Sequence, residues 1–164
     1  MTLVKVRSRG INLADTFAFT GTISGGTSTP AFQARRASTL TFSDNTATKV
    51  TGFSEDFDTD NNFASDRFTP TTAGKYFVTV TGNIHGVTNY DMYNGKISIY
   101  KNGSEFAYNT QDQYRGTGLV SNCMCQCIVS CNGTGDYFEM YAKHNGGGNA
   151  IQGSNSTFMI MRIA

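Results

Sequence analysis

The segment from Asp66 to Ile84 constrains the fold more than any other part of the sequence. Residues 67–69 form a short run of strand-forming residues, and Pro70 and Gly74 bring turn chemistry, because proline fixes φ and glycine tolerates a positive φ. In residues 76–81, aromatic and valine side chains alternate with threonines and a phenylalanine, which is the two-residue period of a sheet strand. The segment therefore predicts two strands that pair as a hairpin through a tight turn.

The composition favours one all-β domain. The chain has 164 residues, 15% of them charged, with 18 Gly, 12 Phe, 8 Tyr and only 2 Pro. This balance is typical of short strands joined by many turns, in a chain long enough to bury a core without disulfides. The formal net charge of +1 and the lack of a long basic run argue against nucleic acid as a partner. We also expect no membrane insertion, because no apolar stretch approaches the length of a bilayer span.

Residues 1–29 differ from the rest and predict an N-terminal arm and linker, followed by a domain over residues 30–164. Residues 24–29 are rich in glycine, serine and threonine, as in a linker. Phe17 and Phe19 share one face of a possible strand and need a place to be buried. Two alternatives remain open: the arm packs on its own domain, or it docks onto a neighbouring protein.

Ten short strand candidates follow from Ala31 onward, which is a number typical of a β-sandwich. The turns between them are explicit in the sequence. Asn102-Gly103 is the strongest hairpin signal, since a type I′ turn needs a positive φ at both central residues. The candidates span residues 31–37, 38–42, 48–57, 66–69, 76–85, 95–101, 104–108, 118–131, 137–144 and 156–163.

The order of six short motifs resembles the C1q-like and tumour-necrosis-factor-like domains over about residues 30 to 164. No single motif is specific, but they follow one another in the order of that family. They are Pro30-Ala-Phe-Gln-Ala34, Phe57-Asp58 before Asp66-Arg67-Phe68, Pro70 with Gly74, Tyr76 and Phe77, Lys101-Asn102-Gly103, Gly135-Asp136-Tyr137 and Ser156-Thr157-Phe158. The resemblance implies a jelly-roll sandwich of about ten antiparallel strands that assembles as a homotrimer. It also implies trimer or core packing for Phe77, Tyr137 and Tyr141.

The N-terminal segment resembles the leaders of short virion proteins of tailed bacteriophages, where such a leader precedes a C1q-like domain. The chain shows neither an apolar signal-peptide core nor a collagen stalk, both of which are usual in animal C1q-like proteins. We therefore expect a virion protein that is assembled in the host cytoplasm. Its other partners would be capsid or tail proteins.

Four cysteines, at positions 123, 125, 127 and 131, look like a metal site at first sight. On a strand they share one face with Val129, and neighbours two residues apart are roughly 6–7 Å from each other. That spacing is too wide for adjacent ligands of one tetrahedral zinc and disfavours disulfides. We therefore expect core or interface packing, with a metal or inter-subunit role as the alternative.

Other candidate sites are weaker. His85 and His144 lie at the ends of expected strands without a motif that pairs them with a nucleophile, so the sequence predicts no enzyme. Asp56, Asp58 and Asp60 offer oxygen ligands for Ca²⁺, but they fit no EF-hand, and a solvated acidic loop is the competing interpretation. The glycine-rich residues 145–149 lack the lysine and the helix of a phosphate loop.

Tyrosines in or beside expected loops offer contact surface for a partner or a glycan, although tyrosine is also an ordinary strand residue. Tyr90, Tyr93 and Tyr114 are the candidates for such partner-binding loops. The sequence therefore predicts a homotrimeric structural protein on the exterior of a phage particle, acting as a tail-fibre tip, an adaptor or a capsid decoration. The alternative is a receptor-recognition protein that binds or degrades a host glycan, for which no pair of catalytic carboxylates can be assigned.

Overall fold

The computed structural model describes residues 30–86, 94–112, 120–145 and 149–164, and these form a sandwich of two antiparallel sheets. The predicted all-β jelly-roll class is confirmed, with twelve strands instead of about ten. The strands are β1 Ala31–Arg36, β2 Leu40–Phe42, β3 Thr48–Lys49, β4 Phe53–Asp58, β5 Phe63–Ala64, β6 Arg67–Phe68, β7 Gly74–Gly86, β8 Asn94–Lys101, β9 Ser104–Asp112, β10 Val120–Cys131, β11 Phe138–Asn145 and β12 Asn149–Arg162.

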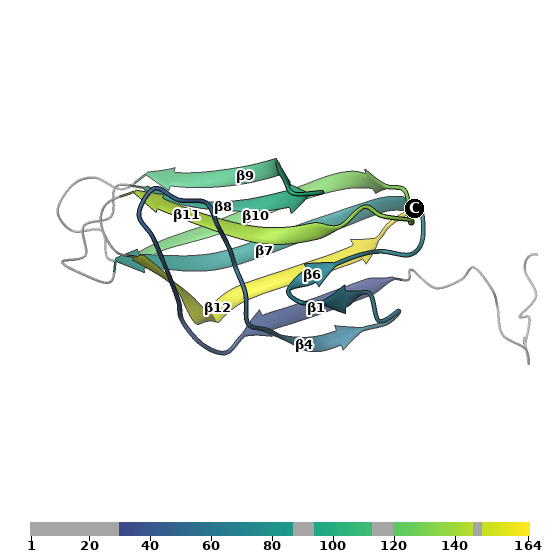
Figure 1. The fold of residues 1–164 in the computed structure, drawn as a ribbon, viewed down its shortest axis with the longest axis horizontal. Coiled ribbons are helices and arrows are strands. Elements are labelled where there is room, and N and C mark those ends of the chain that lie inside the picture. Colours follow the sequence, from purple (N-terminus) through teal and green to yellow (C-terminus); the bar gives the residue numbers. More distant parts are fainter. Residues whose placement is uncertain (1–29, 87–93, 113–119, 146–148) are drawn as a thin grey trace, which may run out of the picture.

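Two sheets of six strands each make up the sandwich. Sheet A has the order β10-β7-β12-β1-β4, with β2 paired to β12, and sheet B has the order β5-β6-β11-β8-β9, with β3 paired to β11. Figure 1 shows β8, β9 and β11 as one layer over β7, β10 and β12. No helix long and apolar enough to cross a membrane occurs among the described residues.

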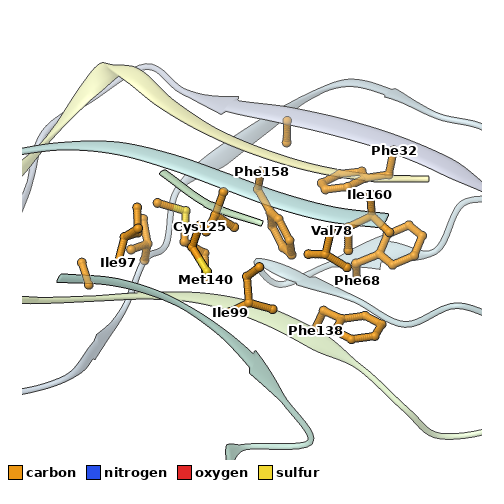
Figure 2. Packing of buried hydrophobic residues seen from close by; sticks show 14 of the residues in the cluster. Phe32, Phe68, Val78, Ile97, Ile99, Cys125, Phe138, Met140, Phe158 and Ile160 are labelled. Carbon is orange, nitrogen blue, oxygen red and sulfur yellow. The ribbon is translucent and has the colours of Figure 1, made fainter. Parts of the chain in front are cut away.

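The core lies between the two sheets and follows from the two-residue alternation of the strands. Tyr76, Val78 and Val80 of β7 are fully buried, as the sequence predicted for that strand. Phe32 stacks on Phe63 with ring centroids 4.3 Å apart. Figure 2 shows Phe32, Phe68 and Phe138 towards one side of the interior and Ile97 with Met140 and Cys125 towards the other, with Phe158, Val78 and Ile99 between them. This apolar interior holds the two sheets together.

Two expectations about the strands are wrong. Residues 67–69 and 76–84 do not pair as a hairpin, because β6 belongs to sheet B and β7 to sheet A. The turn at Pro70 and Gly74 instead carries the chain from one sheet to the other. The expected strand over residues 48–57 is broken at Gly52, where φ is +82°, so that β3 joins sheet B and β4 joins sheet A.

The hairpin at Asn102-Gly103 is confirmed. Their φ values are +54° and +78°, and they connect β8 to β9. Ser65 and Asp66 form a similar two-residue turn between β5 and β6, with φ values of +53° and +57° and no glycine. Turns of this type match the twist of the strands that they join.

The sandwich has two distinct ends. The chain enters at Pro30 beside the C-terminal strand, where the Arg162 amide donates to the Pro30 carbonyl, and the C-terminus lies at this same end (Figure 1). The opposite end carries the ends of β7, β9 and β11 and the starts of β8, β10 and β12. We call them the arm end and the distal end.

Candidate functional site

The outward face of sheet A exposes large apolar side chains. Ile128 is 61% exposed, Met124 50% and Met161 40%, and Phe77 and Met159 are half-buried beside them. We call this surface the sheet A face and define it by these five residues together with Thr79. None of the six carries a charge. Contiguous exposed apolar surface of this kind marks an interaction site more often than an ordinary protein surface.

The strand register arranges these side chains in rows across the sheet. Ile128 of β10 lies directly opposite Phe77 of β7, and Phe77 lies directly opposite Met161 of β12. In the next row, Met159 of β12 lies opposite Thr79. Directly opposite side chains are about 4.5–5.5 Å apart at Cβ, so each row is continuous.

Towards the distal end the same face becomes polar. The Thr81 and Thr157 hydroxyls lie 2.6 Å apart, and the Asn83 amide donates to the Asn122 side-chain oxygen at 2.7 Å. The Thr79 hydroxyl and the Asn83 side-chain oxygen are buried without a hydrogen-bond partner. Buried polar atoms that lack a partner are costly, so this part of the face gains from any partner that supplies a donor or an acceptor.

The outward face of sheet B is built differently, around ion pairs. The Glu139 carboxylate is buried and accepts hydrogen bonds from Lys49 at 2.8 Å and from Arg67 at 2.9 Å. Burial alone would raise the pKa of Glu139, but the two hydrogen bonds and the two positive charges together hold it below its ordinary value. The Arg67 guanidinium also lies over the Tyr137 ring, 3.9 Å from its centroid.

Tyrosines complete this sheet B face. Tyr141 stacks on Tyr100 with centroids 3.8 Å apart, and Lys96 lies 4.0 Å above the Tyr108 ring. The Lys96 ammonium is also within 2.7 Å of the Glu105 carboxylate. These charged and aromatic groups therefore find their partners within the same chain.

Asp136 ties two turns together at the arm end. Its carboxylate accepts hydrogen bonds from the Asn102 side chain at 2.7 Å and from the Asn132 amide at 2.9 Å, and it lies 3.0 Å from the Lys101 ammonium. These contacts, the Asn102 hydrogen bond foremost, lower the pKa of Asp136 from 3.8 to about 2. The arrangement fixes the β8–β9 hairpin against the turn that precedes β11.

The cysteines line the inner side of β10, as the alternation predicted. Cys123, Cys125 and Cys131 are buried, and Cys127 is half-buried on the same side. All four are free thiols. Burial raises the pKa of Cys125, and it raises that of Cys127 to about 11. The described residues contain no group of three or more ligand side chains that could hold a metal ion.

The acidic residues suggested for Ca²⁺ have separate roles. Asp56 accepts three hydrogen bonds from Arg35 and one from Gln33, whereas Asp58 accepts a hydrogen bond from the backbone amide of Phe63 and so shapes its own loop. Asp60 donates its amide to Asp58. The structure does not gather these three carboxylates around one point.

His144 is fully buried in sheet B, and His85 is half-buried on β7 of sheet A. Burial lowers the pKa of His144, although Asp44, whose carboxylate lies 3.9 Å from its Nδ1 atom, partly offsets this effect. The His144 imidazole is therefore neutral at pH 7. His144 is therefore a core residue.

The predicted packing residues lie on two different faces. Phe77 lies on the sheet A face, whereas Tyr137 and Tyr141 lie on the sheet B face and are not part of the core. Phe17, Phe19, Tyr90, Tyr93 and Tyr114 lie outside the described residues.

Sequence reasoning missed Ile128, Met124 and Met161. The signal was present, since cysteines and valine alternate with Met124, Gln126 and Ile128 along β10, and both sets contain apolar residues. A strand that is apolar on both faces predicts burial on both sides. In this chain only one side of β10 is covered.

Comparison with known proteins gives the fold but no closer relationship. The sequence matches no family model, and no curated protein is similar to it in sequence. Among solved structures, murine APRIL is similar with a TM-score of 0.62 and 9% identity, over 82% of this chain and 98% of that one. Eiger TNF from S. frugiperda gives a TM-score of 0.61 at 10% identity, over 82% of this chain and 94% of that one.

The globular domain of zebrafish complement 1qA protein gives a TM-score of 0.60 at 12% identity, over 82% of this chain and 98% of that one. The fold is therefore that of the C1q/TNF-like jelly rolls. The predicted resemblance is confirmed at the level of the fold.

Proposed function

We propose that this chain is a homotrimeric structural protein on the exterior of a tailed-phage particle, assembled in the host cytoplasm and without enzymatic activity. The observation that carries the proposal is the sheet A face. A domain that exposes Ile128, Met124 and Met161 on one continuous surface needs a cover in water.

Copies of the same chain provide that cover. The six residues of the sheet A face carry no charge, with Lys75 at their border on β7, and the Ile128, Phe77 and Met161 row offers apolar contact to an identical row. Burying each large apolar side chain contributes about 1.5–3 kcal/mol. A closed cyclic arrangement hides all copies of the face at once, and the resemblance to C1q-like and tumour-necrosis-factor-like domains implies three copies.

The two ends of the sandwich give the trimer a direction. Residue 30 of each copy lies at the arm end, so we assign the attachment to the particle to this end of the trimer. The distal end then points away from the particle. The strands that flank residues 87–93 and 113–119 end there, so the loops with Tyr90, Tyr93 and Tyr114 connect strands at the outward side.

This polarity suits both roles that the sequence leaves open. A capsid decoration attaches through its arms and needs nothing at the distal end, whereas a fibre tip or adaptor also presents the distal end to the host. The glycan-degrading alternative has less support. Of the two pockets described in the structure, only one is lined by a carboxylate, Asp56, and that carboxylate is bound by Arg35.

The particle location tests this proposal. Immunogold labelling and cryo-electron microscopy of purified particles should place the protein on the head or on the tail. Absence of the protein from purified particles would refute the virion role.

The arm is tested separately by replacing Phe17 and Phe19 together with aspartate. We expect the double variant to assemble as the wild type does in solution but to be missing from particles, because its arm can no longer bury an apolar face. Normal incorporation of the double variant would show that the arm does not attach the protein.

A further inference from the structure

A small polar pocket lies at the distal end of sheet B, on the opposite side of the sandwich from the sheet A face. Its volume is about 180 Å³, enough for a small polar group rather than a whole oligosaccharide. It is formed where β8 begins and where β9 and β11 end, together with one residue of the turn before β3. Its lining residues are Asn45, Asn94, Lys96, Thr110, Lys143 and Asn145.

Two lysines face each other in this pocket. Lys143 of β11 lies directly opposite Lys96 of β8 in the strand register. Like charges at directly opposite positions destabilise a sheet, so the pair has a cost in the free domain. Lys96 relieves part of the cost by turning its ammonium towards Glu105 and the Tyr108 ring on β9.

The positive charge of Lys143 is not offset in this way. Among the described residues its ammonium has no carboxylate partner, whereas Lys49, Lys96 and Lys101 each form an ion pair. The described lining residues include no carboxylate. Carboxylates on the neighbouring segments have other contacts or positions: Glu105 pairs with Lys96, Asp44 lies beside His144, and Asp112 lies opposite Asn94 at the exposed end of β9.

The other lining residues are neutral hydrogen-bonding groups. Three asparagine amides and the Thr110 hydroxyl surround the Lys143 position, so they can donate to an oxyanion and also bond to sugar hydroxyls. One uncompensated ammonium matches a group with a single negative charge. Tyr108, 60% exposed on the neighbouring strand, offers an aromatic side chain beside the pocket.

We propose that this pocket binds the carboxylate of an acidic sugar residue in a surface glycan, with Lys143 as its charged contact and the asparagine amides as hydrogen-bond donors. The inference rests on the proposed function, because it is the proposed attachment to the particle that leaves the distal end facing outwards. It deepens that function by assigning the chain to the host-contacting role and by naming the ligand class.

The test is isothermal titration calorimetry of the full chain at low ionic strength with three probes: an oligomer of glucuronic acid, a neutral glucose oligomer of equal length, and sodium sulfate. Lys143→Ala is the variant and Lys75→Ala is the matched control. Both remove one positive charge, but Lys75 lies exposed at the arm end of β7. The molar mass of each protein is measured in the same samples.

We expect saturable binding of the glucuronate oligomer, no binding of the neutral oligomer, and affinity that falls with added salt. Lys143→Ala should weaken binding by about tenfold or more, and Lys75→Ala should leave it unchanged. Three results would each overturn the inference: no binding of the glucuronate oligomer, equal binding of the neutral oligomer, or unchanged binding by Lys143→Ala. Binding of sulfate without the glucuronate oligomer would also overturn it, as an adventitious ion only.

The molar mass separates this inference from the proposed function. If the protein binds the glucuronate oligomer through Lys143 but has the molar mass of a single chain, the proposed trimer is wrong and the proposed binding pocket is supported. A protein that has the mass of a trimer but does not bind the oligomer contradicts the pocket alone.

Discussion

The two outward faces of this sandwich satisfy their side chains in opposite ways. On the sheet B face, Glu139, Lys49 and Arg67 neutralise one another, and Tyr100 stacks on Tyr141. On the sheet A face, Ile128 and Met161 flank Phe77, and both are largely exposed to solvent. Apart from Lys143, the charged groups described on the sheet B face find partners within a single chain, whereas the apolar side chains of the sheet A face need a partner to cover them. Exposure alone does not distinguish the faces, since Tyr108 and Ile128 are 60% and 61% exposed.

The largest expected effect comes from Ile128→Asp, which places a charge on the sheet A face in the row that Ile128 forms with Phe77 and Met161. An unpaired charge buried in an apolar interface costs about 3–5 kcal/mol, so the trimer should dissociate into single chains. Analytical ultracentrifugation measures this. Tyr108→Asp is the matched control, because it adds the same charge at equal exposure on the other face. If both variants kept the wild-type mass, the sheet A face would not be the interface.

The second effect belongs to the sheet B face. Glu139→Gln removes the carboxylate that pairs with Lys49 and Arg67, and we expect the free energy of unfolding to fall by about 2–3 kcal/mol without a change in molar mass. Urea denaturation measures it, at a protein concentration that is held fixed. The control is Glu55→Gln on exposed β4, which should stay within about 0.5 kcal/mol of the wild type. A loss of assembly by Glu139→Gln with unchanged stability would reverse the roles that we give to the two faces.

A smaller effect, on the stability of the folded chain, is expected at acidic pH. The pKa of Asp136 is lowered from 3.8 to about 2, chiefly by the Asn102 hydrogen bond. Its charge therefore contributes stability that is present above the unfolded value of 3.8 and is lost as the pH falls towards 2. Urea midpoints between pH 5 and pH 2 should fall less steeply in Asp136→Asn than in the wild type. Parallel pH profiles would show that this carboxylate contributes nothing to stability in acid.

The smallest effect concerns the two faces of a single strand, β10. Its outward side chains are exposed in the single chain, whereas its inward thiols are packed between the sheets. Burial raises the pKa of Cys127 to about 11. Alkylation by iodoacetamide at pH 8 should therefore be slow in the folded protein and fast in urea, because the thiolate is the reactive form. Mass spectrometry of the modified peptides measures it. Rapid modification of Cys125 in the folded protein would mean that the inner side of β10 is open.

The fold was largely predictable from the sequence, because the alternation of apolar and polar side chains and the residues that form turns can both be recognised within short segments. Tyr76, Val78 and Val80 indicated a buried strand, and Asn102-Gly103 indicated the hairpin between β8 and β9. The sheet to which each strand belongs was not predictable in the same way. The segment after Pro70 looked like a hairpin turn, but it crosses between the sheets, and this depends on pairings with β11 and β12 far along the chain.

The surfaces were harder to predict than the core. Phe77 was assigned to packing from its aromatic character, and it lies on the sheet A face, but Tyr137 and Tyr141 lie on the opposite side of the molecule. Nothing local in the sequence distinguishes a tyrosine that stacks on its own chain from one that meets a partner. The pocket around Lys143 depends on three strands and one turn, so no motif in one segment could indicate it.

The molar mass of the wild-type chain in solution tests the central claim most directly. Native mass spectrometry of the full-length protein should give three times the chain's 17.8 kDa, with no large population of single chains at micromolar concentration. A dominant species at 17.8 kDa would mean that the sheet A face stays exposed or is covered by something other than a second copy of this chain.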